Sequence, residues 1–138
     1  MPLFEQALDT YPDTVKVVFK HYPLSFHKKA LPAALASLAA AEQGKFWEYH
    51  DELFLHQNSL SSDKYLEIAQ NLGLDLKMFS LDMMRPSVRK KIDQDISDAK
   101  KAGVTGTPTL FVNGRKVKKR DFDAMSKLID AELSKLQK

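Results

Sequence analysis

The order of elements along the chain predicts an α/β layer structure. A helix precedes a strand, several helices follow, and the chain closes with a strand, a hairpin turn, a second strand and a last helix. The length of 138 residues is enough for one domain with its own core. Apolar residues make up 43% and charged residues 28% of the chain, which argues against a disordered chain, a collagen or a coiled coil.

The first helix and the first strand lie at the beginning of the chain. Apolar residues recur on one helical face over residues 3–11, and no capping residue precedes them, so this helix is already under way at residue 3. After a proline-containing turn, β-branched and aromatic residues predict a strand over residues 15–22. Residues 17–19 are all apolar, which favours a strand covered on both faces.

The middle of the chain is predicted to be helical. A run of small apolar residues is followed by an aromatic stripe with Phe46, Trp47 and Tyr49, which we interpret as core, with a peptide groove as the alternative. Two further segments with apolar residues at 3–4 spacing, and a short helical piece between them, complete this region. The helices are expected over residues 31–41, 46–54, 62–72, 75–83 and 86–102, the third capped by Ser62-Asp63.

The C-terminal part predicts a β-hairpin and a helix. Residues 109–112 form one strand, Asn113-Gly114 is the strongest short hairpin signal available, and residues 115–119 form the returning strand. Asp121 is expected to cap the last helix, whose apolar residues make one face.

The connector before this hairpin contains the most informative step of the sequence, Thr107-Pro108. Proline is allowed as the first residue of a strand because its missing N–H lies outside the ladder. A cis bond there would present the flanking backbone to an extended peptide, although only about 5–6% of X–Pro bonds in folded proteins are cis. The residues alone therefore leave two interpretations: an ordinary turn proline, which the rarity of cis bonds favours, and a cis-proline at a peptide-binding loop.

Two parts of the sequence resemble a known family. The run Val104-Thr105-Gly106-Thr107-Pro108-Thr109, with the hairpin and the closing helix, resembles the C-terminal half of a thioredoxin fold. The first strand, the Pro23-Leu24 turn and the helical insert with Phe46-Trp47 resemble the DsbA-like thiol:disulfide oxidoreductases. The resemblance covers essentially the whole chain. It implies a single thioredoxin-like domain over residues 1–138, with a helical insertion at about 27–102.

The resemblance implies a substrate-binding loop but no catalytic group in this chain. Pro108 would be the cis-proline, Thr107 the residue before it that contacts substrate, and Gly106 the third residue of the loop. In the family, a Cys-X-X-Cys pair at the N-terminus of the first helix forms or exchanges disulfides in exported proteins, and this chain has no cysteine. Because that exchange requires a thiolate, we expect the chain as given to be redox-inactive, with no cofactor and no metal.

The family's first central strand has no counterpart in the chain either. In a thioredoxin sheet it lies between the strand at residues 15–22 and the strand at residues 109–112, so its absence would expose unpaired backbone on both. We expect that the chain recruits a strand, dimerises or swaps one, or closes the gap by pairing these two segments directly. Backbone hydrogen bonds between the two segments would mark closure.

The remaining chemistry-bearing residues give weaker signals. His50 and His56 are six residues apart, which does not match the spacing of a helical metal site. A basic run is interpreted as the solvated edge of the hairpin, with an acidic partner or phosphates as the alternative. It consists of Arg115, Lys116, Lys118, Lys119 and Arg120.

Composition also limits the partners. A net charge of +3 does not by itself indicate nucleic-acid binding. The longest weakly polar stretch has 11 residues, against the roughly 20 that span a bilayer, and the beginning of the chain lacks a signal-peptide pattern. We therefore expect a protein or peptide partner and no membrane span.

Three hypotheses about function follow. The first is a shortened disulfide oxidoreductase whose parent is exported, usually to the periplasm, and the uncapped first helix favours it. The second is a non-redox module that binds an extended peptide near Pro108 or takes part in assembly. The third, a thioredoxin-fold enzyme with another chemistry, has no residue that supports it specifically.

Overall fold

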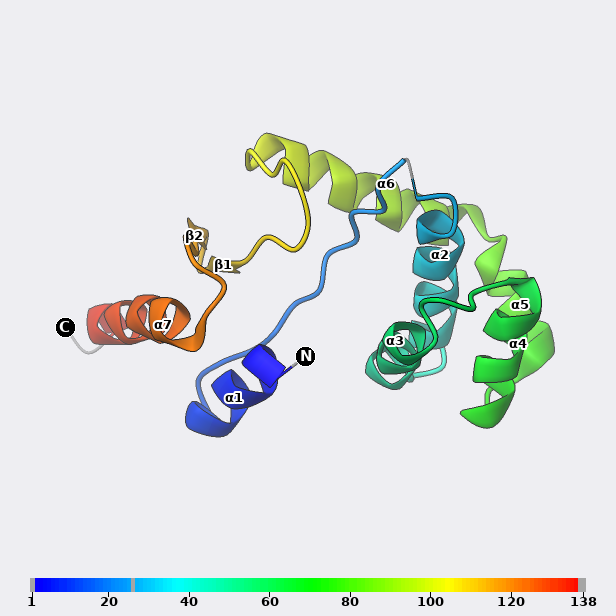
Figure 1. Ribbon diagram of the computed structural model, residues 1–138, viewed down its shortest axis with the longest axis horizontal. Coiled ribbons are helices and arrows are strands. Elements are labelled where there is room, and N and C mark those ends of the chain that lie inside the picture. Colours follow the sequence, from blue (N-terminus) through cyan, green and yellow to red (C-terminus); the bar gives the residue numbers. More distant parts are fainter. Residues whose placement is uncertain (1, 26, 137–138) are drawn as a thin grey trace. The chain divides into compact units, whose positions relative to one another are not determined.

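The computed structural model describes residues 2–25 and 27–136 (Figure 1). The chain divides into two compact units: the first combines Met1–Phe19 with Val104–Lys138, and the second is Lys20–Gly103. The helices are α1 (Pro2–Thr10), α2 (Ala30–Ala41), α3 (Phe46–Leu55), α4 (Ser62–Asn71), α5 (Leu76–Met83), α6 (Pro86–Lys101) and α7 (Phe122–Leu136), and the strands are β1 (Phe111–Val112) and β2 (Arg115–Lys116).

The first unit contains a hairpin and the two terminal helices. β1 and β2 pair antiparallel, with Val112 opposite Arg115. Asn113 and Gly114 both have a positive φ, of 47° and 82°, as the central residues of a type I′ turn require. The predicted hairpin is therefore confirmed, although its strands are shorter than the expected 109–112 and 115–119.

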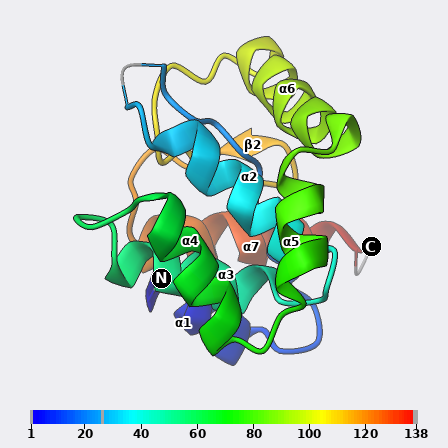
Figure 2. The ribbon, with the colours of Figure 1, turned by 90° about the vertical axis from the view of Figure 1, so that its right-hand side faces the viewer.

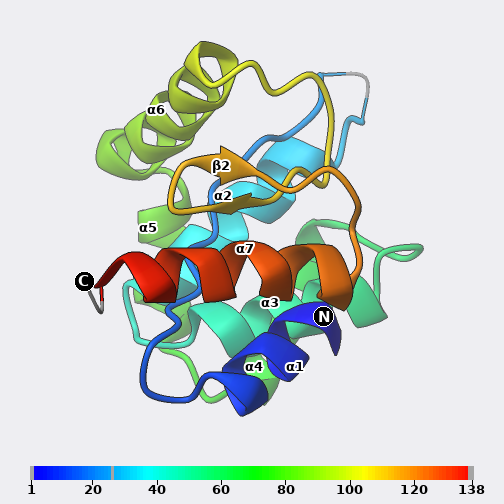
Figure 3. The same ribbon diagram turned by 90° about the vertical axis from the view of Figure 1, so that its left-hand side faces the viewer.

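Helix α7 provides the packing surface of this unit. It lies beside both the hairpin and α1, as Figure 3 shows. Its apolar face contributes Met125 and Ile129 to a small core that Ala7 of α1 completes. Only these three residues of the cluster are buried, and larger side chains around them are partly exposed. The predicted amphipathic helices at the two ends of the described chain are confirmed.

The second unit is built around α2, with α3, α4 and α5 gathered on it (Figure 2). The small residues of α2 allow close approach, and Ala36, Ala39 and Ala40 are fully buried. The rings of Tyr49 and Phe79 meet at 5.6 Å between their centroids and form the largest part of the core. The predicted interpretation of Tyr49 as a core residue is thus confirmed.

The predicted helices of this region are confirmed, with one shift of a cap. Ser61 caps α4, because its hydroxyl oxygen accepts a hydrogen bond from the Lys64 N–H at 3.1 Å. The expectation that Ser62 does so is wrong, since Ser62 is already the first helical residue. Gly73, with a φ of 76°, follows α4 as expected for a helix stop.

The predicted strand over residues 15–22 is wrong. These residues belong to no strand, and exposure alternates along them, with Val18 66% exposed, so they are not covered on both faces. Within the described part of the chain, the sheet consists of β1 and β2, and none of residues 15–22 joins it as a strand. A strand requires a hydrogen-bonded neighbour. Of the three expected answers to the missing central strand, direct closure is not adopted, and strand recruitment and dimerisation or swapping stay predictions.

Candidate functional site

The loop around Pro108 comes just before the hairpin of the first unit. The Thr107–Pro108 peptide bond is cis. The Thr109 hydroxyl donates a hydrogen bond to the Gly106 carbonyl at 2.7 Å, which closes a tight turn around the proline. Thr107 and Pro108 are exposed, whereas Gly106 is half-buried. The loop is therefore accessible at the two residues that flank the cis bond.

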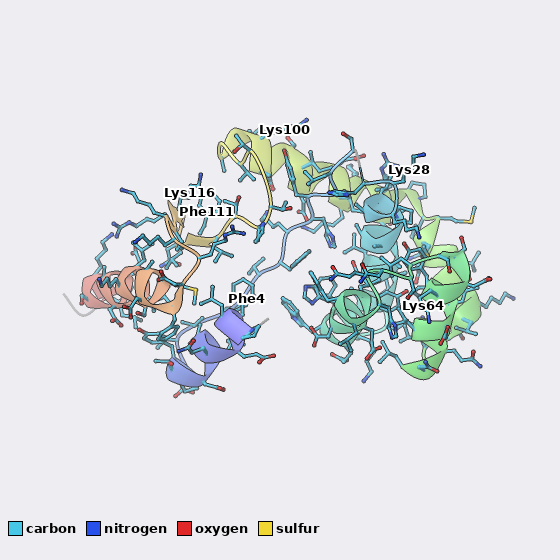
Figure 4. All side chains as sticks on the ribbon, in the orientation of Figure 1. Phe4, Lys28, Lys64, Lys100, Phe111 and Lys116 are labelled. Atoms are coloured by element: carbon cyan, nitrogen blue, oxygen red, sulfur yellow. The ribbon has the colours of Figure 1, made fainter. Side chains whose placement is uncertain are left out.

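A pocket of about 410 Å³ lies beside this proline. Its wall combines the beginning of α1, the segment that leads into β1 and the residue before the cap of α7. Figure 4 shows Phe4 at the end of α1 that is nearer to the hairpin with Phe111 and Lys116. Four of the lining residues are apolar and one is a cation, and all belong to the first unit: Leu3, Phe4, Pro108, Leu110 and Arg120.

One of the three predicted substrate-binding residues, Pro108, lines this pocket, while Gly106 and Thr107 lie in the adjoining loop. Two lining residues were not predicted: Phe4 lies on a predicted helix, and Arg120 belongs to the basic run that was interpreted as a solvated edge. Both lie beside the proline only because α1 packs near the segment from Pro108 to Arg120. The spacing of residues along the sequence does not predict this contact.

A second group of ionisable side chains lies in the second unit. His21 and His50 are 5% and 4% exposed, and the Phe46 ring stands 5.9 Å from each of their rings. Burial lowers the pKa of His21 to about 4, against an opposing effect of Asp95. Asp51 Oδ1 lies 3.1 Å from His50 Nδ1. Within residues 2–25 and 27–136, no three potential ligands gather as a metal site would require.

The interpretation of the aromatic stripe as core is wrong for Trp47, which is 40% exposed. Phe54, near the end of the same helix, is 54% exposed. The rings of both approach His50, at 5.2 and 4.9 Å. His50 is thus covered by aromatic side chains that themselves reach the surface.

Asp95 anchors the segment before α2 to α6. It is fully buried, and its carboxylate accepts hydrogen bonds from the His21 backbone N–H at 2.9 Å and from Lys91 Nζ at 2.8 Å. Beside it, Lys20 pairs with Asp98 at 3.0 Å, and this hydrogen bond is the main cause that lowers the pKa of Asp98. These contacts hold two lysines, two carboxylates and a backbone N–H together, so we interpret the cluster as structural.

A match to a known protein family identifies the family of this chain. A family model described as thioredoxin matches residues 2–131. The chain belongs to the thioredoxin family. The predicted family and fold class are therefore confirmed, as a mostly helical member with a small two-stranded sheet.

Two solved thioredoxin-fold proteins superpose on nearly the whole chain. A thioredoxin-like oxidoreductase from Silicibacter pomeroyi DSS-3 matches with a TM-score of 0.82 and 28% identity, over 97% of this chain and 77% of that one. The oxidoreductase DsbA from Xylella fastidiosa matches with a TM-score of 0.74 over 99% of this chain and 78% of that one. At 24% identity the second match shows the fold alone.

Longer proteins contain a related stretch of sequence. The Na(+)/H(+) antiporter NhaA 3 of Salinispora tropica is 44% identical over 116 residues, which cover 83% of this chain and 18% of the antiporter. The antiporter NhaA of Herminiimonas arsenicoxydans is 37% identical over 77% of this chain and 17% of its own length. This thioredoxin-family chain thus spans less than a fifth of these relatives. None of its described helices combines the length and apolar character that crossing a membrane requires.

Proposed function

We propose that this chain supplies the peptide-binding part of a thiol:disulfide oxidoreductase and binds an extended segment of a substrate protein beside Pro108. The observation that carries the proposal is the pocket that joins Pro108 to the beginning of α1. Such a concave, mostly apolar wall beside an exposed loop is typical of binding sites. Gly106, Thr107 and Pro108 would form the backbone edge of this site.

The backbone at Thr107 supports binding of an extended peptide rather than of a folded surface. Among the described residues, neither the N–H nor the carbonyl of Thr107 takes part in a backbone hydrogen bond, and the residue is exposed. An extended peptide satisfies such groups by adding itself as a strand, and its side chains then enter adjacent pockets. The pocket beside Pro108 is placed to receive one of them.

Disulfide chemistry at this site needs a cysteine that the 138 residues do not contain. Exchange proceeds by attack of a thiolate on a disulfide sulfur, and no other side chain here replaces it. The proposal therefore assigns to this chain the binding and orientation of the substrate, over residues 1–138 as one thioredoxin-like domain with its helical insertion at about 27–102. The alternative is a non-redox module that uses the same loop for assembly.

The antiporter names of the relatives do not change this proposal. The matched stretch is 18% of one antiporter and 17% of the other, so it represents a segment of each and not the transporter as a whole. We infer that such a segment keeps the thioredoxin-family role of binding a polypeptide.

A binding titration of the 138-residue chain with a reduced and alkylated, unfolded protein tests the proposal. We expect Pro108→Ala to weaken binding roughly tenfold, the size of a moderate interface hot spot. Pro12→Ala, the same change in the exposed turn after α1, is the matched control and should bind like the parent chain. Equal affinity of all three chains, with unchanged circular dichroism, would show that the loop is not the binding site.

A further inference from the structure

We propose that the pocket beside Pro108 selects segments in which an acidic residue adjoins an apolar one, with Arg120 as the residue that determines this specificity. The inference rests on the proposed peptide-binding function and names its substrate class. It starts from the composition of the wall, in which one cation stands among four apolar side chains. An apolar side chain fits the wall, and a carboxylate is the group that a guanidinium binds best, through two parallel hydrogen bonds.

Arg120 is available for a ligand. It is exposed, and within the described residues no ion pair is formed by it, whereas Arg115 at the other end of the same segment lies 3.9 Å from Glu132. The neighbouring carboxylate, Asp121, is engaged elsewhere, since it accepts the Ala124 N–H at 2.8 Å as the cap of α7. Arg120 thus meets the pocket without a counter-ion from its own loop.

The surroundings of Arg120 reinforce the same preference. Residues 115–120 contain five positive charges and no negative one. Lys116, Lys118 and Lys119 are exposed, and the described residues offer them no ion-pair partner within 4.0 Å. The nearest acidic residue along α1, Glu5, is exposed and does not line the pocket. A cluster of positive charges in the segment that leads to Arg120 speeds the encounter with acidic segments and disfavours basic ones.

A solvated sheet edge explains some residues of the basic run but not Arg120. Lysines protect the exposed edge of a hairpin, and Lys116 on β2 fits that role. Arg120 lies beyond both strands and at the pocket wall, where it protects no edge. Its position is explained by a ligand with a negative charge.

A pair of matched peptides tests the inference. Both are extended and share their apolar residues, and one has Asp and Glu where the other has Asn and Gln. We expect the 138-residue chain to bind the acidic peptide about three- to fivefold more tightly, as one partly exposed ion pair allows, and the preference to shrink as salt is added. Arg120→Gln should remove most of the preference. Lys119→Gln, with the same change of charge off the pocket wall, should keep most of it.

The outcomes separate this inference from the proposed function. Equal binding of the two peptides, still weakened by Pro108→Ala, overturns the acidic preference and leaves peptide binding in place. Failure of both peptides to bind removes the proposed function as well. A preference that Lys119→Gln removes as fully as Arg120→Gln would assign it to diffuse charge and overturn the role of Arg120. If vesicles of anionic lipid displaced the acidic peptide from the chain, a lipid surface would be the better ligand, and the inference would be overturned.

Discussion

The two units of this molecule build their cores in different ways. In the second unit, buried residues from each of α2, α3, α4 and α5 meet in one cluster around Tyr49 and Phe79. In the first unit, a cluster of three buried residues joins α1 and α7, and the strands beside them are two residues long. Helices satisfy their own backbone, whereas strands depend on neighbours. The concentrated core therefore lies where the chain is helical, and the candidate site lies in the unit with the sparser core.

The same contrast separates correct from wrong predictions. Helix signals are local, so the spacing of apolar residues over α2 to α6 predicted five helices of nearly the right length. A β-type composition shows only that a segment could form a strand, and not that a neighbouring strand is present to pair with it. Residues 15–22 have that composition, and in the described part of the chain they belong to no strand.

Core truncation gives the largest difference between the units. Phe79→Ala should cost about 3–5 kcal/mol of unfolding free energy, because the side chain is fully buried in the larger cluster. Ile129→Ala should cost about 2 kcal/mol, since its partly exposed surroundings can collapse around the smaller residue. Urea unfolding followed by far-ultraviolet circular dichroism measures both. A larger cost for Ile129→Ala would reverse the assignment of the main core to the second unit.

A control for these values lies on the same helix as Phe79. Leu81 is 55% exposed on α5, so Leu81→Ala should change the unfolding free energy by about 0.5 kcal/mol or less. A cost close to that of Phe79→Ala would mean that α5 buries its other face as well, for example against a partner.

Removal of the buried carboxylate in the second unit gives the next effect. Asp95→Ala leaves the His21 N–H without its acceptor and Lys91 without its partner, and we expect a loss of about 3 kcal/mol. Asp93→Ala removes an exposed carboxylate that lies 3.4 Å from Arg89 on the same helix, and should cost about 0.5 kcal/mol. Similar losses for the two variants would contradict the anchoring role of Asp95.

These two aspartates show what the sequence could not predict. Asp93 and Asp95 both stand in the charged α6, and nothing in their spacing marks one as buried. The distinction arises because residues 20–21 cross the helix at Asp95, a contact between residues 74 positions apart. Arg120 is a similar case, since its place beside Pro108 depends on how α1 closes the pocket. The Thr107-Pro108 loop, by contrast, was found from a short local pattern.

The histidine beside that anchor makes the second unit sensitive to acid. Burial lowers the folded-state pKa of His21 to about 4, with Lys91 and His50 lowering it further and Asp95 opposing them, against roughly 6.5 in the unfolded chain. The unfolded chain therefore binds the proton first, and this stability is present above about pH 6.5 and is lost as the pH falls toward 4. We expect a loss of about 2 kcal/mol over that interval, measured by urea unfolding at successive pH values. His21→Phe, which keeps a ring beside Phe46, should flatten this part of the profile, and an unchanged profile would show that other groups cause it.

The smallest effect compares two adjacent serines at the start of α4. Ser61→Ala removes the side chain that accepts the Lys64 N–H, and should cost about 1 kcal/mol. Ser62→Ala replaces the first helical residue by a better helix former, and should leave the unfolding free energy within about 0.5 kcal/mol of the parent or raise it slightly. Denaturation midpoints of the two variants decide between them. If Ser62→Ala were the costlier change, the cap would lie where the sequence pattern placed it, one residue later. The capping pattern in the sequence would then have predicted the start of α4 correctly.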